Sequence, residues 1–246
     1  MNPIDYHEIV DVFHEHQNPT TTAKLDQVIN YCDVQDGQRV LDVGCGKGWF
    51  LRRLATQYAI SGLGIDLASY AIREADKVAN SIELRGQLEF QCLPAGDYMP
   101  HEASWDLGVC IGASFAIGSF EDLLDYLTPA VKPGGLLVLG DIYAKQDPMP
   151  AASARYFAGG ALRTLADTAD MLNSDSRSLL AIVDSSQDDW DHYENLHWTA
   201  ADKWLRENPH DPRRDDFVQT HNNYRREHYR HDRAALGWAL FVVRVG

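Results

Sequence analysis

The sequence predicts an α/β fold in which helices flank a mostly parallel β-sheet. Strand-like and helix-like segments alternate over about the first 145 residues, which favours parallel strands joined by crossover helices. Residues 105–111 and 136–139 form almost continuous apolar runs, as expected of strands that are buried on both faces. With 246 residues, of which 45% are hydrophobic and 24% charged, the chain is long enough to cover such a sheet.

The first half divides into short, well-marked elements. Apolar residues at helical spacing, such as Phe50 and Leu54, predict the first crossover helix. Lys132-Pro133-Gly134-Gly135 predicts a turn before the fifth strand. We expect strands at residues 39–43, 59–66, 88–92, 105–111 and 136–139, and helices at 49–57, 68–79 and 123–127.

The second half is predicted to be mainly helical and to end in a strand. We expect helices at 151–172, 188–207 and 215–232, and strands at 179–184 and 238–245. The helix at 188–207 is amphipathic and ends before Pro209. Because the final strand has the pattern of a sheet element, we predict one domain over residues 1–246. An N-terminal helical or lid segment (1–30) and a cap insertion (about 145–235) would complete it.

A glycine-rich turn follows the first strand. The strand leads into Gly44, Gly46 and Gly48, and the second strand ends in Asp66. This arrangement predicts a nucleoside pocket at the carboxyl edge of the sheet, where Asp66 can accept hydrogen bonds from both ribose hydroxyls. A dinucleotide fingerprint would have glycine where Trp49 stands, which disfavours a nicotinamide-dependent oxidoreductase.

The glycine turn, with Asp42 just before it, resembles motif I of the class I S-adenosylmethionine (SAM) dependent methyltransferases. Three further landmarks are similar to the family: Asp97 after the third strand, Trp105-Asp106 opening the fourth, and the Lys132–Gly135 turn. The resemblance implies a Rossmann-like fold with a seven-stranded sheet. It also implies SAM as cofactor and S-adenosylhomocysteine as product.

The resemblance implies roles for three carboxylates at the cofactor. Asp42 would orient the glycine loop, Asp66 would hold the ribose, and Asp97 would bind the adenine amino group. Because Tyr98 follows Asp97 where the family has a small residue, a carboxylate that caps a turn remains the alternative there. The full set expected at the cofactor is Asn18, Asp42, Gly44, Gly46, Gly48, Asp66, Leu67, Ala95, Gly96, Asp97, Cys110 and Ile111.

Two histidines near the N-terminus are candidates for acting on the acceptor. His14 and His16 precede Asn18-Pro19, a segment that resembles one in a subset of bacterial small-molecule methyltransferases. Either histidine could act as a general base. Because the sequence offers them no clear third ligand, we expect no metal. Thr20–Thr22 could simply cap the next helix.

Three further acceptor-site candidates come from the second half. Asp141 and Tyr143 follow the fifth strand, where the carboxyl edge of the sheet faces the acceptor. His197 shares one helix face with Trp190, Tyr193 and Trp204. That face either forms an aromatic acceptor pocket or packs against the sheet.

Composition limits the other classes of function. The formal charge of −14 argues against nucleic acid, so we interpret the basic and aromatic stretch 221–231 as a solvated helix face. The four cysteines lack metal-ligand spacing and are expected to be buried and reduced. No apolar run is long enough for a membrane span. We therefore predict a cytoplasmic protein, and leave its oligomeric state, a homodimer included, open.

The predicted reaction is methyl transfer from SAM to an O, N, S or C nucleophile of a small molecule. The sulfonium donor is already activated, so alignment can supply most of the acceleration and a general base is optional. The alternative is a non-catalytic sensor or partner module that binds SAM or S-adenosylhomocysteine.

Overall fold

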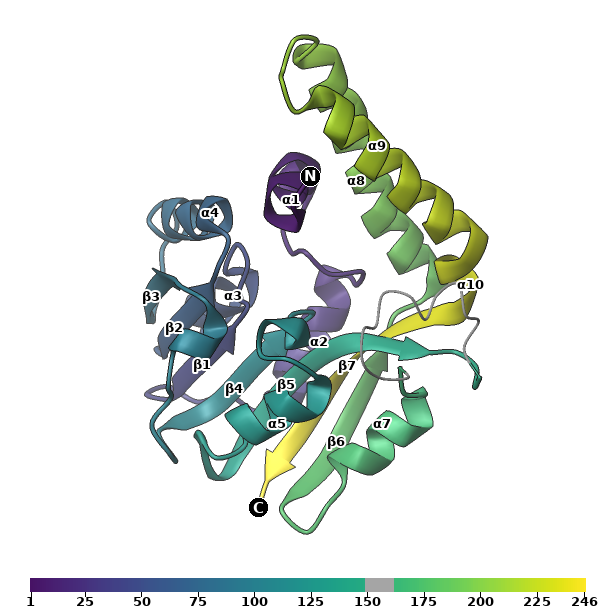
Figure 1. Ribbon diagram of the computed structural model, residues 1–246. Helices are drawn as coiled ribbons and strands as arrows, with labels where there is room; N and C mark the ends of the chain where they lie inside the picture. Colours follow the sequence, from purple (N-terminus) through teal and green to yellow (C-terminus); the bar gives the residue numbers. More distant parts are fainter. Residues whose placement is uncertain (149–161) are drawn as a thin grey trace.

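The computed structural model describes residues 1–148 and 162–246 (Figure 1). Of the helix expected at 151–172, residues 151–161 lie outside the described residues. Its last part corresponds to α7 (Leu165–Leu172). The strands are β1 (Arg39–Val43), β2 (Ser61–Asp66), β3 (Gln87–Cys92), β4 (Trp105–Ile111), β5 (Val131–Ala144), β6 (Arg177–Asp184) and β7 (Leu236–Val245). The helices are α1 (Pro3–Val10), η1 (Asp11–Phe13), α2 (Thr22–Cys32), α3 (Trp49–Gln57), α4 (Ser69–Ala79), η2 (Ala95–Asp97), η3 (Ser114–Ala116), α5 (Phe120–Leu127), α7 (Leu165–Leu172), α8 (Gln187–Glu207), α9 (Arg214–Glu227), the π-helical turn η4 (His228–Asp232) and α10 (Arg233–Ala235).

The strands form one seven-stranded sheet in the order β3-β2-β1-β4-β5-β7-β6. The pairs among β1 to β5 are parallel, whereas β7 runs antiparallel to both β5 and β6. This confirms the predicted seven-stranded, mostly parallel sheet and the return of the final strand. β6 lies inside the span expected as a cap, so part of that span belongs to the sheet.

Helices cover both faces of the sheet. On one face, α2 and α3 bury Leu25, Leu51 and Leu54 against the apolar side of β1, β4 and β7. On the other face, α5 and α7 bury Leu127 and Leu172. A fully buried leucine of this kind contributes about 1.5–3 kcal/mol relative to an exposed one, so these helices fix the sheet that carries the site.

The predicted turn at Lys132–Gly135 is instead an irregularity within β5. Trp105 pairs with Val131 and Leu107 with Leu136, so two steps along β4 match five along β5. Gly134 takes a left-handed φ of 81° within the extra residues. Because β5 pairs with β4 both before and after these residues, the glycines form a bulge within the strand rather than a turn between two elements.

α8 and α9 form a helical hairpin that projects from the sheet, with α1 beside it (Figure 1). Phe217 of α9 is fully buried and stacks on Tyr6 of α1, with ring centroids 5.7 Å apart. The Tyr6 hydroxyl lies 3.1 Å from Nδ1 of His221, and His221 and His228 are both buried. The prediction of a solvated face over 221–231 was therefore wrong for these two histidines, which face α1 and α8.

The structure also tests the expectations for the cysteines, the Thr20–Thr22 segment and a membrane span. Cys32 and Cys110 are buried as predicted, Cys45 is half-buried, and Cys92 is exposed because it ends the edge strand β3. Thr21 caps α2 through a hydrogen bond from the Lys24 amide, as the alternative reading of that segment predicted. Among the described residues, no helix is both long and apolar enough to cross a membrane.

Candidate active site

A cavity of about 540 Å³ opens at the carboxyl edge of the sheet. Its floor comes from the residues that follow β1, β2 and β4, and its wall from the N-terminal segment and Tyr193 of α8. The strand order reverses between β1 and β4, which is where ligands bind in open α/β sheets. The volume falls within the roughly 300–1,000 Å³ of small-molecule sites.

The glycine loop takes a conformation that requires glycine at two positions facing the cavity. Gly44 and Gly46 have left-handed φ angles of 70° and 53°. A Cβ on Gly44 would collide with Ala113, and one on Gly46 would collide with the Gln17 side chain. The left-handed φ angles favour glycine at both positions, and at Gly44 the contact with Ala113 leaves no room for a side chain.

Asp66 holds the loop from the end of β2. One carboxylate oxygen accepts a hydrogen bond from the Gly46 amide at 2.8 Å, and the other accepts one from the Ala68 amide at 2.7 Å. A carboxylate has about four acceptor positions, so capacity for two further hydrogen bonds remains. Burial raises the pKa of Asp66, although the backbone hydrogen bonds act in the opposite direction.

Asp42 also lines the cavity, but it does not hold the glycine loop, contrary to the expectation from the sequence. Its carboxyl is buried, and burial together with the charge of Asp66 raises its pKa to about 8. Within the described residues no hydrogen bond reaches this carboxyl, whereas Asp66 accepts one from the loop. Asp66 therefore takes the orienting role expected of Asp42.

Most of the expected cofactor residues meet at this cavity. Its lining includes Asn18, Asp42, Gly44, Gly46, Asp66, Leu67, Ala95 and Ile111. With its amide nitrogen toward β4, Asn18 donates to the Ile111 carbonyl at 3.1 Å.

Four other expected cofactor residues lie outside the lining. The α-carbon of Gly48 faces Phe90, and Cys110 points to the opposite face of β4 from its neighbours. Gly96 and Asp97 are exposed on η2. A contact between Asp97 and adenine stays a prediction.

Of the five acceptor-site candidates, His16 lines the cavity. Its ring packs edge-on against Trp49, with centroids 5.6 Å apart. Burial lowers the pKa of His16, which keeps the ring neutral. His14, Asp141, Tyr143 and His197 lie outside the lining.

Asp141 and Tyr143 fix the end of β5 instead. Asp141 accepts hydrogen bonds from the Ser114 hydroxyl and, at 2.7 Å, from the Ile142 amide. The Tyr143 hydroxyl donates to Asp184 of β6 at 2.9 Å. Asp141 thus holds η3, which borders the cavity, and Tyr143 joins β5 to β6, whereas neither side chain lines the cavity.

The aromatic face of α8 divides between packing and the cavity. Trp190 packs against the core, and Trp204 packs on Phe217 with ring centroids 4.8 Å apart. His197 is fully buried, whereas Tyr193 reaches the cavity lining. The packing alternative therefore describes most of this face.

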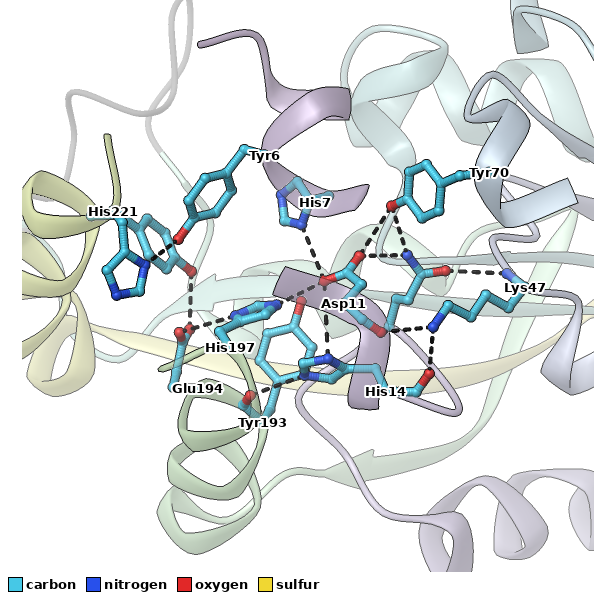
Figure 2. A network of polar contacts seen from close by, with 12 residues as sticks. Tyr6, His7, Asp11, His14, Lys47, Tyr70, Tyr193, Glu194, His197 and His221 are labelled. Atoms are coloured by element: carbon cyan, nitrogen blue, oxygen red, sulfur yellow. Dashed lines mark hydrogen bonds and ion pairs between the residues drawn. The ribbon is translucent and has the colours of Figure 1, made fainter. Parts of the chain in front are cut away.

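Asp11 is the centre of a buried polar network that sequence reasoning missed (Figure 2). His197 Nε2 lies 2.9 Å from Asp11 Oδ1, and Gln17 donates to Asp11 Oδ2 at 2.5 Å. Burial opposes protonation of His197, but hydrogen bonds to Asp11 and Glu194 outweigh it and raise its pKa to about 9. Burial and the neighbouring His197 lower the pKa of His14 to about 4.

The network joins the N-terminal segment to the glycine loop. The Lys47 ammonium donates to the carbonyl oxygens of Asp11 at 2.7 Å and His14 at 2.9 Å. The Lys47 amide donates to the Gln17 side chain at 3.1 Å. The wall and the floor of the cavity are thus a single hydrogen-bonded unit (Figure 2).

Comparison with known proteins agrees with this geometry. Residues 40–135 match the family of methyltransferase domains. An uncharacterized protein of Escherichia coli K12 is 26% identical over 233 residues, which are 94% of each chain. An O-methyltransferase of Pyrenophora dematioidea is 28% identical over 154 residues, 60% of this chain and 58% of that protein.

Solved structures resemble the whole chain. The crystal structure of a SAM-dependent methyltransferase from Thiobacillus denitrificans, in complex with S-adenosylhomocysteine, has a TM-score of 0.88 at 26% identity. The match covers 100% of this chain and 99% of that one. A SAM-dependent methyltransferase from Geobacter sulfurreducens, also in complex with S-adenosylhomocysteine, has a TM-score of 0.89 at 24% identity, with 98% of both chains covered.

Proposed function

This chain is a class I SAM-dependent methyltransferase, and from that premise we propose that it methylates a small molecule bound beside SAM in the cavity. The observation that carries the proposal is the glycine loop held by Asp66 at the reversal of strand order. Such a loop lets a nucleoside approach the backbone closely, and Asp66 provides a carboxylate that can accept hydrogen bonds from its ribose.

We propose that the cofactor lies along the floor of the cavity. The two free acceptor positions of Asp66 would bind the ribose hydroxyls. Gly44 and Gly46 would lie against the methionine part, and Leu67 and Ala95 would contact the nucleoside, since all four line the same cavity.

The acceptor side of the cavity has an apolar rim. Ile4 of α1 is 39% exposed and Phe115 of η3 is 78% exposed, yet both line the cavity. Exposed apolar side chains gathered at one opening favour an apolar ligand surface. We therefore propose an acceptor with an apolar or aromatic body, and the formal charge of −14 supports a metabolite over a nucleic acid.

The reaction needs alignment more than added chemistry. A lone pair of the acceptor forms a bond to the methyl carbon while the carbon–sulfur bond breaks, and the electron pair of that bond stays on sulfur. S-adenosylhomocysteine and a methylated acceptor result, and the acceptor's proton passes to solvent or to a nearby base such as His16. Holding both molecules in line supplies much of the acceleration.

A cytoplasmic location also belongs to this proposal. All four cysteines are free thiols, as expected in a reducing compartment. Fractionation of cells that express the chain would test the location independently of its activity.

The test is S-adenosylhomocysteine release from SAM with a panel of apolar, aromatic and charged acceptors. We expect release that depends on an apolar acceptor, and a KM for it about tenfold higher in Phe115→Ala with unchanged SAM affinity. Met99→Ala is the matched control, because Met99 is also 78% exposed but lies outside the lining. SAM binding without release for any acceptor would favour the sensor alternative.

A further inference from the structure

We propose that the buried network around Asp11 is a binding site for a divalent transition-metal ion of the zinc type, held by His7, Asp11, His14 and His197. His7 and Asp11 belong to the wall of the cavity and none of the four residues to its floor, and the inference does not depend on the methyl-transfer proposal. It rests on the arrangement of ring nitrogens around one carboxylate oxygen (Figure 2).

Three imidazole nitrogens surround Asp11 Oδ1. His197 Nε2 lies at 2.9 Å, His7 Nδ1 at 3.4 Å and His14 Nδ1 at 4.0 Å. A tetrahedral zinc site with bonds of about 2.0–2.1 Å has neighbouring ligand atoms about 3.3 Å apart. The observed separations from Oδ1 lie on both sides of that value. The ligand atoms of His7, Asp11 and His197 all lie within 4.8 Å of one another, and His14, which falls outside this cluster, would move toward the ion as the fourth ligand.

The tautomer of His14 leaves a lone pair that faces Asp11. His14 Nε2 lies 3.0 Å from the Tyr193 carbonyl oxygen, which can only accept, so Nε2 carries the proton and Nδ1 carries the lone pair. His14 Nδ1 is buried and finds no hydrogen-bond partner among residues 1–148 and 162–246. The Nδ1 lone pair and the Asp11 carboxylate oxygen would repel each other in this buried place. A cation bound between the two atoms would satisfy both.

The outer contacts match those of a metal centre. Histidines that bind a metal usually donate their second ring N–H to a carboxylate or a carbonyl oxygen. His197 Nδ1 lies 3.4 Å from Glu194, and His14 Nε2 lies on the Tyr193 carbonyl. Hydrogen bonds from Gln17 and Tyr70 occupy Asp11 Oδ2, which leaves Oδ1 for the ion.

The ligand types select the ion. Three imidazoles and one carboxylate suit Zn²⁺, whereas Mg²⁺ and Ca²⁺ prefer oxygen ligands throughout. Without an ion, His197 is protonated between the carboxylates of Asp11 and Glu194, so a dication would displace the proton on Nε2 and take over its balancing charge. The ion would join α1 and η1 to α8, so its role would be to hold the cavity wall in place.

The experiment uses the full, untagged chain after treatment with a chelator. We expect one equivalent of Zn²⁺ to bind, and one equivalent of Co²⁺ to give the visible absorption of a tetrahedral site. His7→Gln and His14→Gln should each weaken Zn²⁺ binding by at least tenfold. His7 is partly exposed and should tolerate the change, and the exposed His210, changed in His210→Gln, is the matched control.

Absence of Zn²⁺ and Co²⁺ binding by the wild-type chain would overturn the proposal and leave a hydrogen-bonded His197–Asp11 pair. Binding that survives both His7→Gln and His14→Gln would also overturn it, as an adventitious ion only. SAM titration of the same metal-free samples separates this outcome from a failure of the methyltransferase proposal. His7 and Asp11 line the wall of the same cavity, but none of the four ligands belongs to the glycine loop or is Asp66, the groups that would bind SAM.

Discussion

Replacing Asp66 by alanine tests the ribose assignment most sharply. The substitution removes an ionised acceptor at the end of β2, which lies in the cavity lining and can still accept two hydrogen bonds. A hydrogen bond to a charged group contributes about 1.5–3 kcal/mol, and water in the open cavity would replace part of what is lost. A net loss of about 1.5–3 kcal/mol corresponds to SAM affinity weakened roughly 10- to 150-fold.

The assay is calorimetric titration of the purified variant with SAM, accompanied by thermal unfolding. Asp66→Ala also removes the acceptor for the Gly46 and Ala68 amides, so unfolding must show that the fold persists. Asp125→Ala, an exposed carboxylate on α5, is the control and should bind SAM like the wild type. A folded Asp66→Ala variant with affinity within twofold of wild type would refute the reasoning.

Two further substitutions test the loop and the aromatic face. Gly44→Ala places a Cβ against Ala113 and should weaken SAM binding by at least tenfold, whereas Gly37→Ala, equally left-handed but in open space, should leave SAM affinity unchanged in the same titration. Trp190→Ala removes an indole that packs on the core and donates to Glu194 at 3.2 Å. Urea denaturation should show about 2–3 kcal/mol lower stability with SAM affinity retained, and a loss of turnover alone would contradict the packing role.

The parts of the site that the sequence predicts are those made by neighbouring residues. The strand, the glycine loop and Asp66 lie within about two dozen residues, and the local pattern determines their arrangement. Side chains alternate between the two faces of a strand. This rule could also have predicted that Ile111 of β4 lines the cavity while its neighbour Cys110 does not.

The network around Asp11 could not be predicted in the same way. Asp11 and His197 are 186 positions apart, and they meet only because α8 packs against α1 and η1. The helical spacing of His7 and Asp11 was a visible signal, but it carries no information on the third partner. Of the candidate ligands around His14, Asp11 lies three positions away in the sequence, and only His197 is brought in by a tertiary contact.

The helix face of α8 shows a second limit. Its periodicity correctly groups Trp190, Tyr193, His197 and Trp204, yet the packing of α1 and α9 decides which of them reaches the cavity. Likewise, the glycines after Lys132 signal a change of backbone direction. Only the pairing of β5 with β4 before and after them shows that they form a bulge.

The central claim is that the cavity binds SAM, and calorimetric titration of the purified chain with SAM, S-adenosylhomocysteine and NAD tests it most directly. We predict micromolar binding of both adenosyl ligands and no binding of NAD. Failure of SAM and S-adenosylhomocysteine to bind, or a preference for NAD, would contradict the assignment of the glycine loop and Asp66.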